Sequence, residues 1–294
     1  MKNQLDRRGF LRMAGAAGAG IGLISLGRSP LAAAPVAKGA PNAEKLGWRL
    51  GCQAYSFNRF TFYEAVDKVA SLGLHYIEVF PGQRLSREKP NEQTNESMSP
   101  ALRKEVKQKL ADSGVKMVCF GVGGHGRGTF EFAKDMGIET LVCEPSFEAF
   151  DEIEKLCEEF EINVALHNHP KPSRYWNPDT VLKVCEGRSK RIGACADTGH
   201  WMRSGLNPIE CLKKLEGRIV SFHFKDLNQM GGGHDVPWGT GAGDVKGMLT
   251  EIHRQKIQAV FSIEYEHNWD NSLPEIAECV AYFDKVAAEL AAKS

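Results

Sequence analysis

The sequence has no excess charge of either sign and no closely spaced pair of cysteines. Its 294 residues contain 37 Lys and Arg against 37 Asp and Glu, so the formal net charge is zero. Such a chain has no general electrostatic attraction to nucleic acid or to an anionic membrane. None of its eight cysteines forms a Cys-x-x-Cys pair, which leaves a thiolate zinc site or a redox pair without support. Cys52, Cys119, Cys143 and Cys195 stand within apolar runs and are predicted to be buried free thiols.

The start of the chain also lacks an apolar run long enough for a membrane span of ~20 residues. Arg7 and Arg8 precede Phe10 and a short stretch rich in Ala and Gly, and the small residues at 32–34 offer a cleavage site. This pattern resembles the twin-arginine export signal. A general secretory signal and an uncleaved anchor are the alternatives. No cysteine follows the apolar stretch directly, so a lipid anchor is not expected. The resemblance implies export by the twin-arginine machinery to the periplasm.

From Gly47 onward, short apolar runs alternate with amphipathic segments. Eight such strand–helix units in ~250 residues are what a (β/α)8 TIM barrel, an α/β fold, requires. We therefore expect a signal peptide at 1–34, a flexible linker at 35–46 and one barrel domain at 47–294. Strands are predicted at 48–54, 75–80, 116–122, 139–144, 162–167, 191–196, 218–224 and 259–265. Helices are predicted at 61–72, 100–113, 130–136, 147–160, 178–186, 208–215, 245–255 and 274–292.

The active site of such a barrel forms where the strands end. Three long segments, 81–99, 168–177 and 226–244, follow predicted strands and are expected to surround that face. The last of them is rich in glycine, so its backbone amides could bind a phosphate or the segment could fold over the site. Export favours a substrate without phosphate.

Four of the predicted strands carry a polar residue at or near their ends that suits a metal site. Glu144, Asp197 and Glu264 end three strands, and His223 lies near the end of another. Converging buried carboxylates are unfavourable unless they pair with cations or bind a metal. Three oxygen donors and one imidazole suit Mn²⁺, Co²⁺ or Mg²⁺, and Zn²⁺ is a further candidate. We therefore predict one divalent metal ion bound by these four residues, with manganese expected first.

The order of these residues resembles that of the xylose isomerase-like barrels of sugar phosphate isomerases and epimerases, over the chain from Gly47 onward. The resemblance implies that the four residues hold the metal. It also implies that Glu144 and Glu264 act as the catalytic acid and base. His200, three residues after Asp197, would then contact substrate oxygens.

Four more residues are candidates for substrate binding. His167 and His169 end the fifth strand on the same side and are expected to contact substrate, shuttle protons or add metal ligands. Lys225 shares the parity of His223 and is expected to neutralise a substrate oxygen or an enolate. Glu78 ends the second strand and is expected to bind a hydroxyl at the pocket edge.

These residues predict an exported, metal-dependent sugar isomerase or epimerase that removes a proton α to a carbonyl of a small carbohydrate. A metal-dependent lyase acting on 3-keto-glycosides is an alternative, because the same proton abstraction can expel a group one carbon further on. A nicotinamide-dependent oxidoreductase is another, because the sequence Gly-Val-Gly-Gly-His-Gly at 121–126 fits the dinucleotide fingerprint. Two strand–helix units precede that fingerprint, which normally follows the first strand of its domain.

Overall fold

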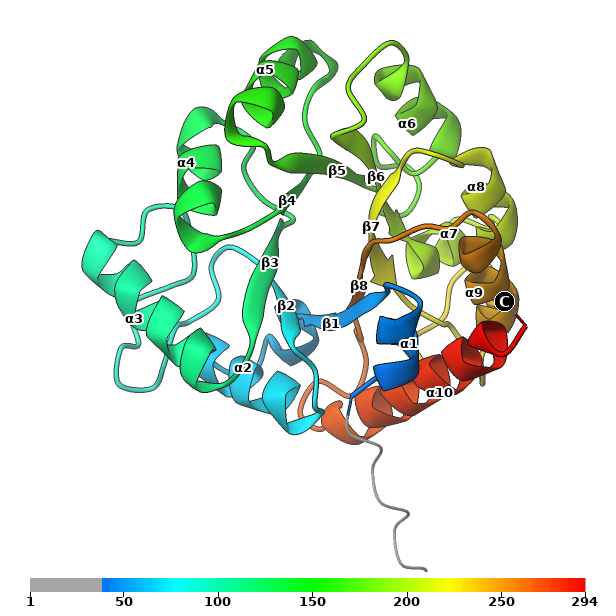
Figure 1. Ribbon diagram of the computed structural model, residues 1–294, viewed down its shortest axis with the longest axis horizontal. Helices are drawn as coiled ribbons and strands as arrows, with labels where there is room; N and C mark the ends of the chain where they lie inside the picture. Colours follow the sequence, from blue (N-terminus) through cyan, green and yellow to red (C-terminus); the bar gives the residue numbers. More distant parts are fainter. Residues whose placement is uncertain (1–38, 294) are drawn as a thin grey trace, which may run out of the picture. The chain divides into compact units, whose positions relative to one another are not determined.

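Eight parallel strands close into a barrel in the computed structural model, which describes residues 39–293 (Figure 1). Each strand pairs with the next one along the chain, and β8 pairs with β1. The strands are β1 Arg49–Gln53, β2 Tyr76–Val79, β3 Lys116–Gly121, β4 Thr140–Cys143, β5 Asn163–His167, β6 Ile192–Asp197, β7 Ile219–Phe224 and β8 Val260–Ile263. The predicted (β/α)8 TIM barrel is therefore confirmed, and every predicted strand overlaps an observed one.

Helices follow the strands and surround the barrel (Figure 1). They are α1 Pro41–Lys45, α2 Phe62–Ser71, α3 Pro100–Asp112, α4 Arg127–Met136, α5 Phe150–Phe160, α6 Pro178–Cys185, α7 Thr198–Arg203, α8 Pro208–Lys214, α9 Val245–Arg254 and α10 Leu273–Ala291, with short 3₁₀ turns η1 Ala54–Phe57 and η2 Phe147–Ala149. Their starts follow from local chemistry. Thr61 and Glu64 form a capping box at α2, in which each side chain bonds the backbone N–H of the other residue.

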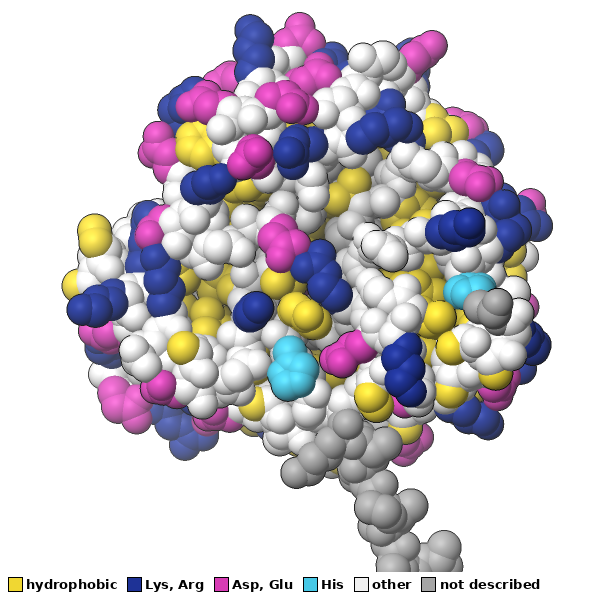
Figure 2. Space-filling model, viewed as in Figure 1, with side chains coloured by type: hydrophobic (Ala, Val, Ile, Leu, Met, Phe, Trp, Pro, Cys, Tyr) yellow, Lys and Arg dark blue, Asp and Glu magenta, His cyan; other side chains and the backbone are white. Residues whose placement is uncertain are grey.

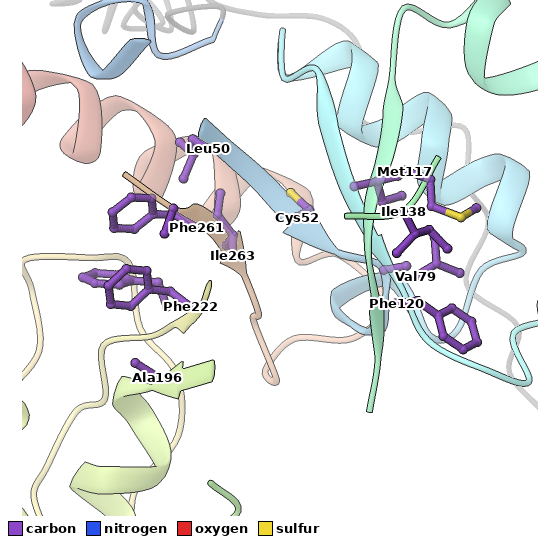
Figure 3. Close-up of a cluster of buried hydrophobic side chains, with 14 of the residues drawn as sticks. Leu50, Cys52, Val79, Met117, Phe120, Ile138, Ala196, Phe222, Phe261 and Ile263 are labelled. Carbon is purple, nitrogen blue, oxygen red and sulfur yellow. The ribbon is translucent and has the colours of Figure 1, made fainter. Parts of the chain in front are cut away.

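The hydrophobic core lies between the strands and the helices that cover them. Figure 3 shows Phe222 of β7 and Phe261 of β8 against each other, and their rings stack with centroids 4.5 Å apart. Each is completely buried, and burial of one such side chain contributes about 1.5–3 kcal/mol. All eight cysteines are free and buried, as predicted for the four within apolar runs.

Charges of both signs are interspersed over the face of the molecule seen in Figure 2, and no broad area of that face carries one sign alone. Many of the charges are paired across neighbouring elements, as in Arg127 with Glu159 at 2.6 Å and Lys107 with Asp135 at 2.5 Å. Exposed pairs of this kind contribute only ~0–1 kcal/mol each. They keep the surface balanced, in line with the zero net charge of the sequence.

Helix α1 lies within the segment that was expected to be a flexible linker, 35–46. Asp284 of α10 accepts hydrogen bonds from the backbone N–H of Asn42 at 2.6 Å and of Ala43 at 3.2 Å. A carboxylate at the start of a helix satisfies free N–H groups and complements the helix dipole. The described part of this segment is therefore tied to the barrel. The predicted signal peptide, 1–34, lies outside the described residues. Within 39–293, no helix is both long and apolar enough to cross a bilayer.

Helix α7 is not among the helices predicted from the sequence. Asp197 ends β6 and caps this helix, since its Oδ1 accepts the backbone N–H of His200 at 2.7 Å. The cap fixes the backbone that carries His200. The three long segments 81–99, 168–177 and 226–244 each follow a strand, namely β2, β5 and β7.

Candidate active site

Two carboxylates and two imidazoles converge where the strands end. His167 ends β5, Asp197 ends β6, His223 lies on β7 and Glu264 directly follows β8. One donor atom from each lies within 4.8 Å of the others, and all four residues are buried. Three of them, Asp197, His223 and Glu264, belong to the predicted metal set. The fourth place is taken by His167, which the sequence marked as a candidate for several roles.

Two buried ring nitrogens in this group make no hydrogen bond within the described part of the chain. They are Nε2 of His167, 3.5 Å from Asp197 Oδ2, and Nδ1 of His223, 3.0 Å from Glu264 Oε2. A buried polar atom without a partner is unfavourable, and it calls for an explanation such as a bound ion or water. Two imidazole nitrogens beside two carboxylates are donors that divalent metals use. The residues present therefore fit a divalent cation.

Glu78 lies beneath this group and is almost completely buried. Its Oε1 is 2.8 Å from His223 Nε2, and its Oε2 accepts a hydrogen bond from Ser262 Oγ at 2.6 Å. Both oxygens are thus engaged inside the barrel, away from the pocket edge where a substrate contact was expected. A carboxylate on the far nitrogen of a histidine fixes the tautomer and leaves the near nitrogen free to bind.

Lys225 is completely buried among carboxylates. Its Nζ lies 2.7 Å from Asp197 Oδ2, 2.5 Å from Glu264 Oε2 and 3.3 Å from Glu266 Oε2. Burial alone would lower the pKa of Lys225, but Asp197 and Glu264 hold that pKa well above its usual value. Burial likewise opposes ionisation of Glu264, yet Lys225 and His223 keep the pKa of this carboxyl well below its usual range. The ammonium therefore balances the charge of the carboxylates and does not line the cavity.

Glu144 lies just after β4, outside the group of four. Its Oε1 is 3.2 Å from Nδ1 of His167 and hydrogen bonds with Nδ1 of His169. Burial would raise the pKa of Glu144, but the hydrogen bonds to the two histidines lower it to about 2. The same bond to Glu144 is the main reason that the pKa of His169 is raised. A second cluster consists of Glu144, His167 and His169. His167 belongs to both clusters, because its Nδ1 faces Glu144 and its Nε2 faces Asp197.

A cavity of about 260 Å³ opens beside both clusters. Four predicted residues line it: His167, His169, His200 and Glu264. The remaining lining residues are Gln53, Tyr55, Phe80, Pro81, Gly121, Val122 and Glu266. A wider groove of about 640 Å³ lies elsewhere, along α6, and contains none of the clustered histidines.

Sequence reasoning missed two polar residues of the site. Gln53 ends β1, where its Nε2 donates to the carbonyl of Gly121 at 2.8 Å. Gln53 could have been found from the sequence, because it is a polar residue at the end of a strand, like the other candidates. Arg203 lies on α7 and contacts His200, but nothing in the local sequence distinguishes it from a surface arginine.

Comparison with known proteins places the chain in a family. Residues 66–285 match the family described as xylose isomerase-like TIM barrel. The chain belongs to this family. A solved structure of an uncharacterised protein from Parabacteroides distasonis is 34% identical, covers 81% of this chain and 99% of its own, and superposes with a TM-score of 0.68.

Two solved structures of lower identity share the fold of this xylose isomerase-like barrel. A D-tagatose 3-epimerase-like protein is 16% identical with a TM-score of 0.66, over 83% of this chain and 99% of its own. A xylose isomerase-like protein from Mycobacterium smegmatis, in complex with magnesium, is 13% identical with a TM-score of 0.66, over 83% and 97%. An uncharacterised protein of Sinorhizobium fredii is 28% identical over 93 residues, which are 30% of this chain and only 29% of that relative.

The dinucleotide fingerprint has a structural explanation in this xylose isomerase-like barrel. It begins at Gly121, the last residue of the third strand of a closed barrel, whereas the nicotinamide folds place it after the first strand of an open sheet. A Cβ on Gly121 would lie 2.3 Å from the carbonyl oxygen of Val142. This glycine therefore allows β3 and β4 to approach closely.

The glycine-rich segment after β7 binds a carboxylate of the chain itself. Asp226 Oδ2 accepts the backbone N–H groups of Gly239 at 2.9 Å and Gly241 at 3.0 Å, and Oδ1 accepts that of Gly243 at 2.9 Å. Amides that could have held a phosphate are thus already used. Asp226 folds the segment back onto the end of β7.

Proposed function

We propose that this protein is a metal-dependent carbohydrate isomerase or epimerase that moves a proton at the carbon next to a carbonyl. The observation that carries the proposal is the group of His167, Asp197, His223 and Glu264, whose donor atoms lie together beside a cavity. A divalent cation held there would act as a Lewis acid and stabilise negative charge on substrate oxygens. The magnesium complex of the Mycobacterium smegmatis relative supports metal binding by a barrel of this fold.

Two carboxylates are suited to the proton transfers. Glu264 follows β8 and Glu144 follows β4, which are four strands apart around a ring of eight, so the two residues lie on opposite sides of the barrel. Glu264 lines the cavity, and Glu144 hydrogen bonds with His167 and His169, which line it. One glutamate takes the α-proton, the C–H electron pair forms a C=C bond, and the carbonyl π pair moves onto the oxygen. As the carbonyl re-forms, the C=C pair takes a proton on the opposite face of the carbon from the other glutamate, which enters this step protonated, and the epimer results. Exchange with water then restores the protonation states of the two glutamates. General acid–base catalysis of this kind contributes typically ~10²–10⁴-fold.

Histidines complete the proposed site. His200 lines the cavity, and burial, opposed by Asp197, lowers its pKa well below the usual value, so a neutral ring can donate one hydrogen bond to a substrate oxygen. His169 holds Glu144 and also lines the cavity. We propose these two histidines as the substrate contacts, and His167 as a metal ligand, which is one of the roles that the sequence left open for it.

The substrate we propose is a small sugar or glycoside without phosphate. Capture of the loop amides by Asp226 supports the absence of a phosphate site at that loop. The D-tagatose 3-epimerase-like relative supports a carbohydrate substrate. Export to the periplasm by the twin-arginine route remains part of the proposal, and it favours the same class of substrate.

Hydrogen exchange tests the reaction directly. The metal-loaded enzyme is incubated in deuterated water with keto sugars and with 3-keto-glycosides, and deuterium entry at the α-carbon is followed by NMR. We expect exchange in the wild type and a loss of about 10²–10⁴-fold in Glu144→Gln and Glu264→Gln, with metal content measured in the same samples. Unchanged exchange in both metal-loaded variants would remove the two glutamates from the reaction. Release of a free aglycone would identify elimination as the outcome.

A further inference from the structure

Arg203 joins three elements that surround the cavity. Its NH1 lies 3.0 Å from Nδ1 of His200 and 2.5 Å from Oε2 of Glu266, and its NH2 lies 3.0 Å from Oδ2 of Asp235. Asp235 belongs to the segment after β7, and Glu266 to the segment after β8. Arg203 itself is on α7, with only 18% of its side chain exposed. One guanidinium therefore holds the end of α7 to two neighbouring loops.

The contact with His200 determines the form of the imidazole. A guanidinium has only donors and stays protonated in proteins. Nδ1 of His200 must therefore accept the hydrogen bond, and the proton of the neutral ring resides on Nε2. That nitrogen lies 3.5 Å from Asp197 Oδ2, and the ring lines the cavity. In the opposite tautomer, Nε2 would turn a lone pair toward the Asp197 carboxylate, and Nδ1 would turn its N–H toward the Arg203 guanidinium. Both contacts would be unfavourable.

We propose that Arg203 is a positioning residue, which fixes His200 as the Nε2–H tautomer so that this histidine donates a hydrogen bond to a substrate oxygen. The proposal rests on the function proposed above, because it assigns His200 a substrate contact. Two anchoring carboxylates, Asp235 and Glu266, keep the guanidinium in place. Partners that fix the ring of a metal-ligating histidine are typically worth about 10–100-fold in metal affinity or activity, and we expect the same range for a partner that fixes His200.

The tautomer is measured by long-range ¹H–¹⁵N NMR on metal-free protein labelled at histidine. The signals of His200 are assigned by their loss in His200→Gln. We expect the wild-type ring to carry its proton on Nε2 alone, and the Arg203→Met ring to show the Nδ1–H form or a mixture of both. Arg188→Met is the matched control, because Arg188 also pairs with two carboxylates, Asp151 and Glu154, at similar exposure but outside the cavity lining.

Kinetics separate positioning from a structural role. In Arg203→Met we expect kcat for α-proton exchange to fall about 10–100-fold. Added guanidinium ion should restore part of the lost rate and the Nε2–H signal, and Arg203→Lys should lose less than Arg203→Met. Arg188→Met should keep the wild-type rate and should not respond to guanidinium.

Two results would overturn the proposal. One is a wild-type His200 that carries its proton on Nδ1, a result that does not depend on whether Arg203→Met folds. The other is an unchanged Nε2–H signal in folded Arg203→Met. The tautomer is read without substrate, so a wild type that catalyses no α-proton exchange would reject the proposed function and leave the assignment of Arg203 standing.

Discussion

Glu78 and His223 form a completely buried pair, in which Oε1 of the carboxylate lies 2.8 Å from Nε2 of the imidazole. The pair sits on β2 and β7, which do not neighbour each other in the barrel, so the contact crosses its interior. Ser262 of β8 donates to the other carboxylate oxygen at 2.6 Å. Glu78 thus holds His223 with Nδ1 turned toward Glu264.

This relationship predicts a specific effect of Glu78→Gln. The variant keeps the shape of the side chain but removes the negative charge that strengthens His223 as a metal ligand. We expect the affinity for a divalent metal to fall about 10–100-fold, as measured by titration of chelator-treated protein. Ser262→Ala is the control, because it removes the other partner of Glu78 and leaves the contact with His223; it should change the affinity only slightly. Equal effects of the two variants would contradict the role of Glu78.

The barrel was predictable because each strand is buried on both faces. Such strands appear as short apolar runs, and eight of them separated by amphipathic segments permit few folds. Two helices, α1 and α7, were missed, and the first turn of each is stabilised by a capping side chain. Helix α1 is capped by Asp284, 242 residues after Asn42, which no local pattern reveals. Helix α7 starts with residues typical of a turn and is fixed by the cap from Asp197.

The site was predictable only in part, for a different physical reason. Residues at strand ends in a barrel must converge, which brought Asp197, His223 and Glu264 together as expected. The contacts that each of these side chains makes depend on its rotamer and on the register between neighbouring strands. Glu144 bonds to two histidines of the β5 end, and Glu78 points into the barrel toward His223. Neither orientation follows from the sequence.

Asp226 provides a prediction about stability. In Asp226→Asn one carboxylate oxygen becomes an NH₂ group, which must face backbone N–H groups of the glycine-rich segment. We expect the free energy of unfolding to fall by roughly 3 kcal/mol at pH 8, since buried amides lose charge-assisted bonds. Urea denaturation followed by circular dichroism measures this. Asp244→Asn is the control: Asp244 caps α9 through one oxygen, and Asn caps about as well, so a change within about 0.5 kcal/mol is expected.

Export is tested by the arginine pair near the start of the chain. Replacing Arg7 and Arg8 by Lys should leave full-length precursor in the cytoplasm, because the twin-arginine address is read from that pair. Cell fractionation followed by immunoblotting measures the precursor and the shorter mature form. Arg12→Lys changes a nearby arginine outside the pair and should be exported normally. Normal export of the double variant would reject the twin-arginine route.

The last prediction decides the fourth metal ligand. The sequence predicted Glu144, whereas the structure brings His167 into the group with Asp197, His223 and Glu264. Asp197→Ala should abolish stoichiometric metal binding, because this residue lies at the centre of the donor contacts. We expect His167→Gln to weaken metal affinity at least about 10-fold, since one imidazole donor is lost. Glu144→Gln should retain the metal and lose proton exchange.

Elemental analysis and metal titration on the same purified samples measure these three variants against the wild type. Circular dichroism of each variant shows whether the barrel is folded, so that loss of metal is not confused with loss of structure. His169→Gln is the matched control for His167→Gln, because His169 also bonds Glu144 but lies outside the group of four. Full metal content in His167→Gln together with loss of metal in Glu144→Gln would return Glu144 to the ligand set. In that case the proton-transfer role of Glu144 could be tested only with a variant that still binds the metal.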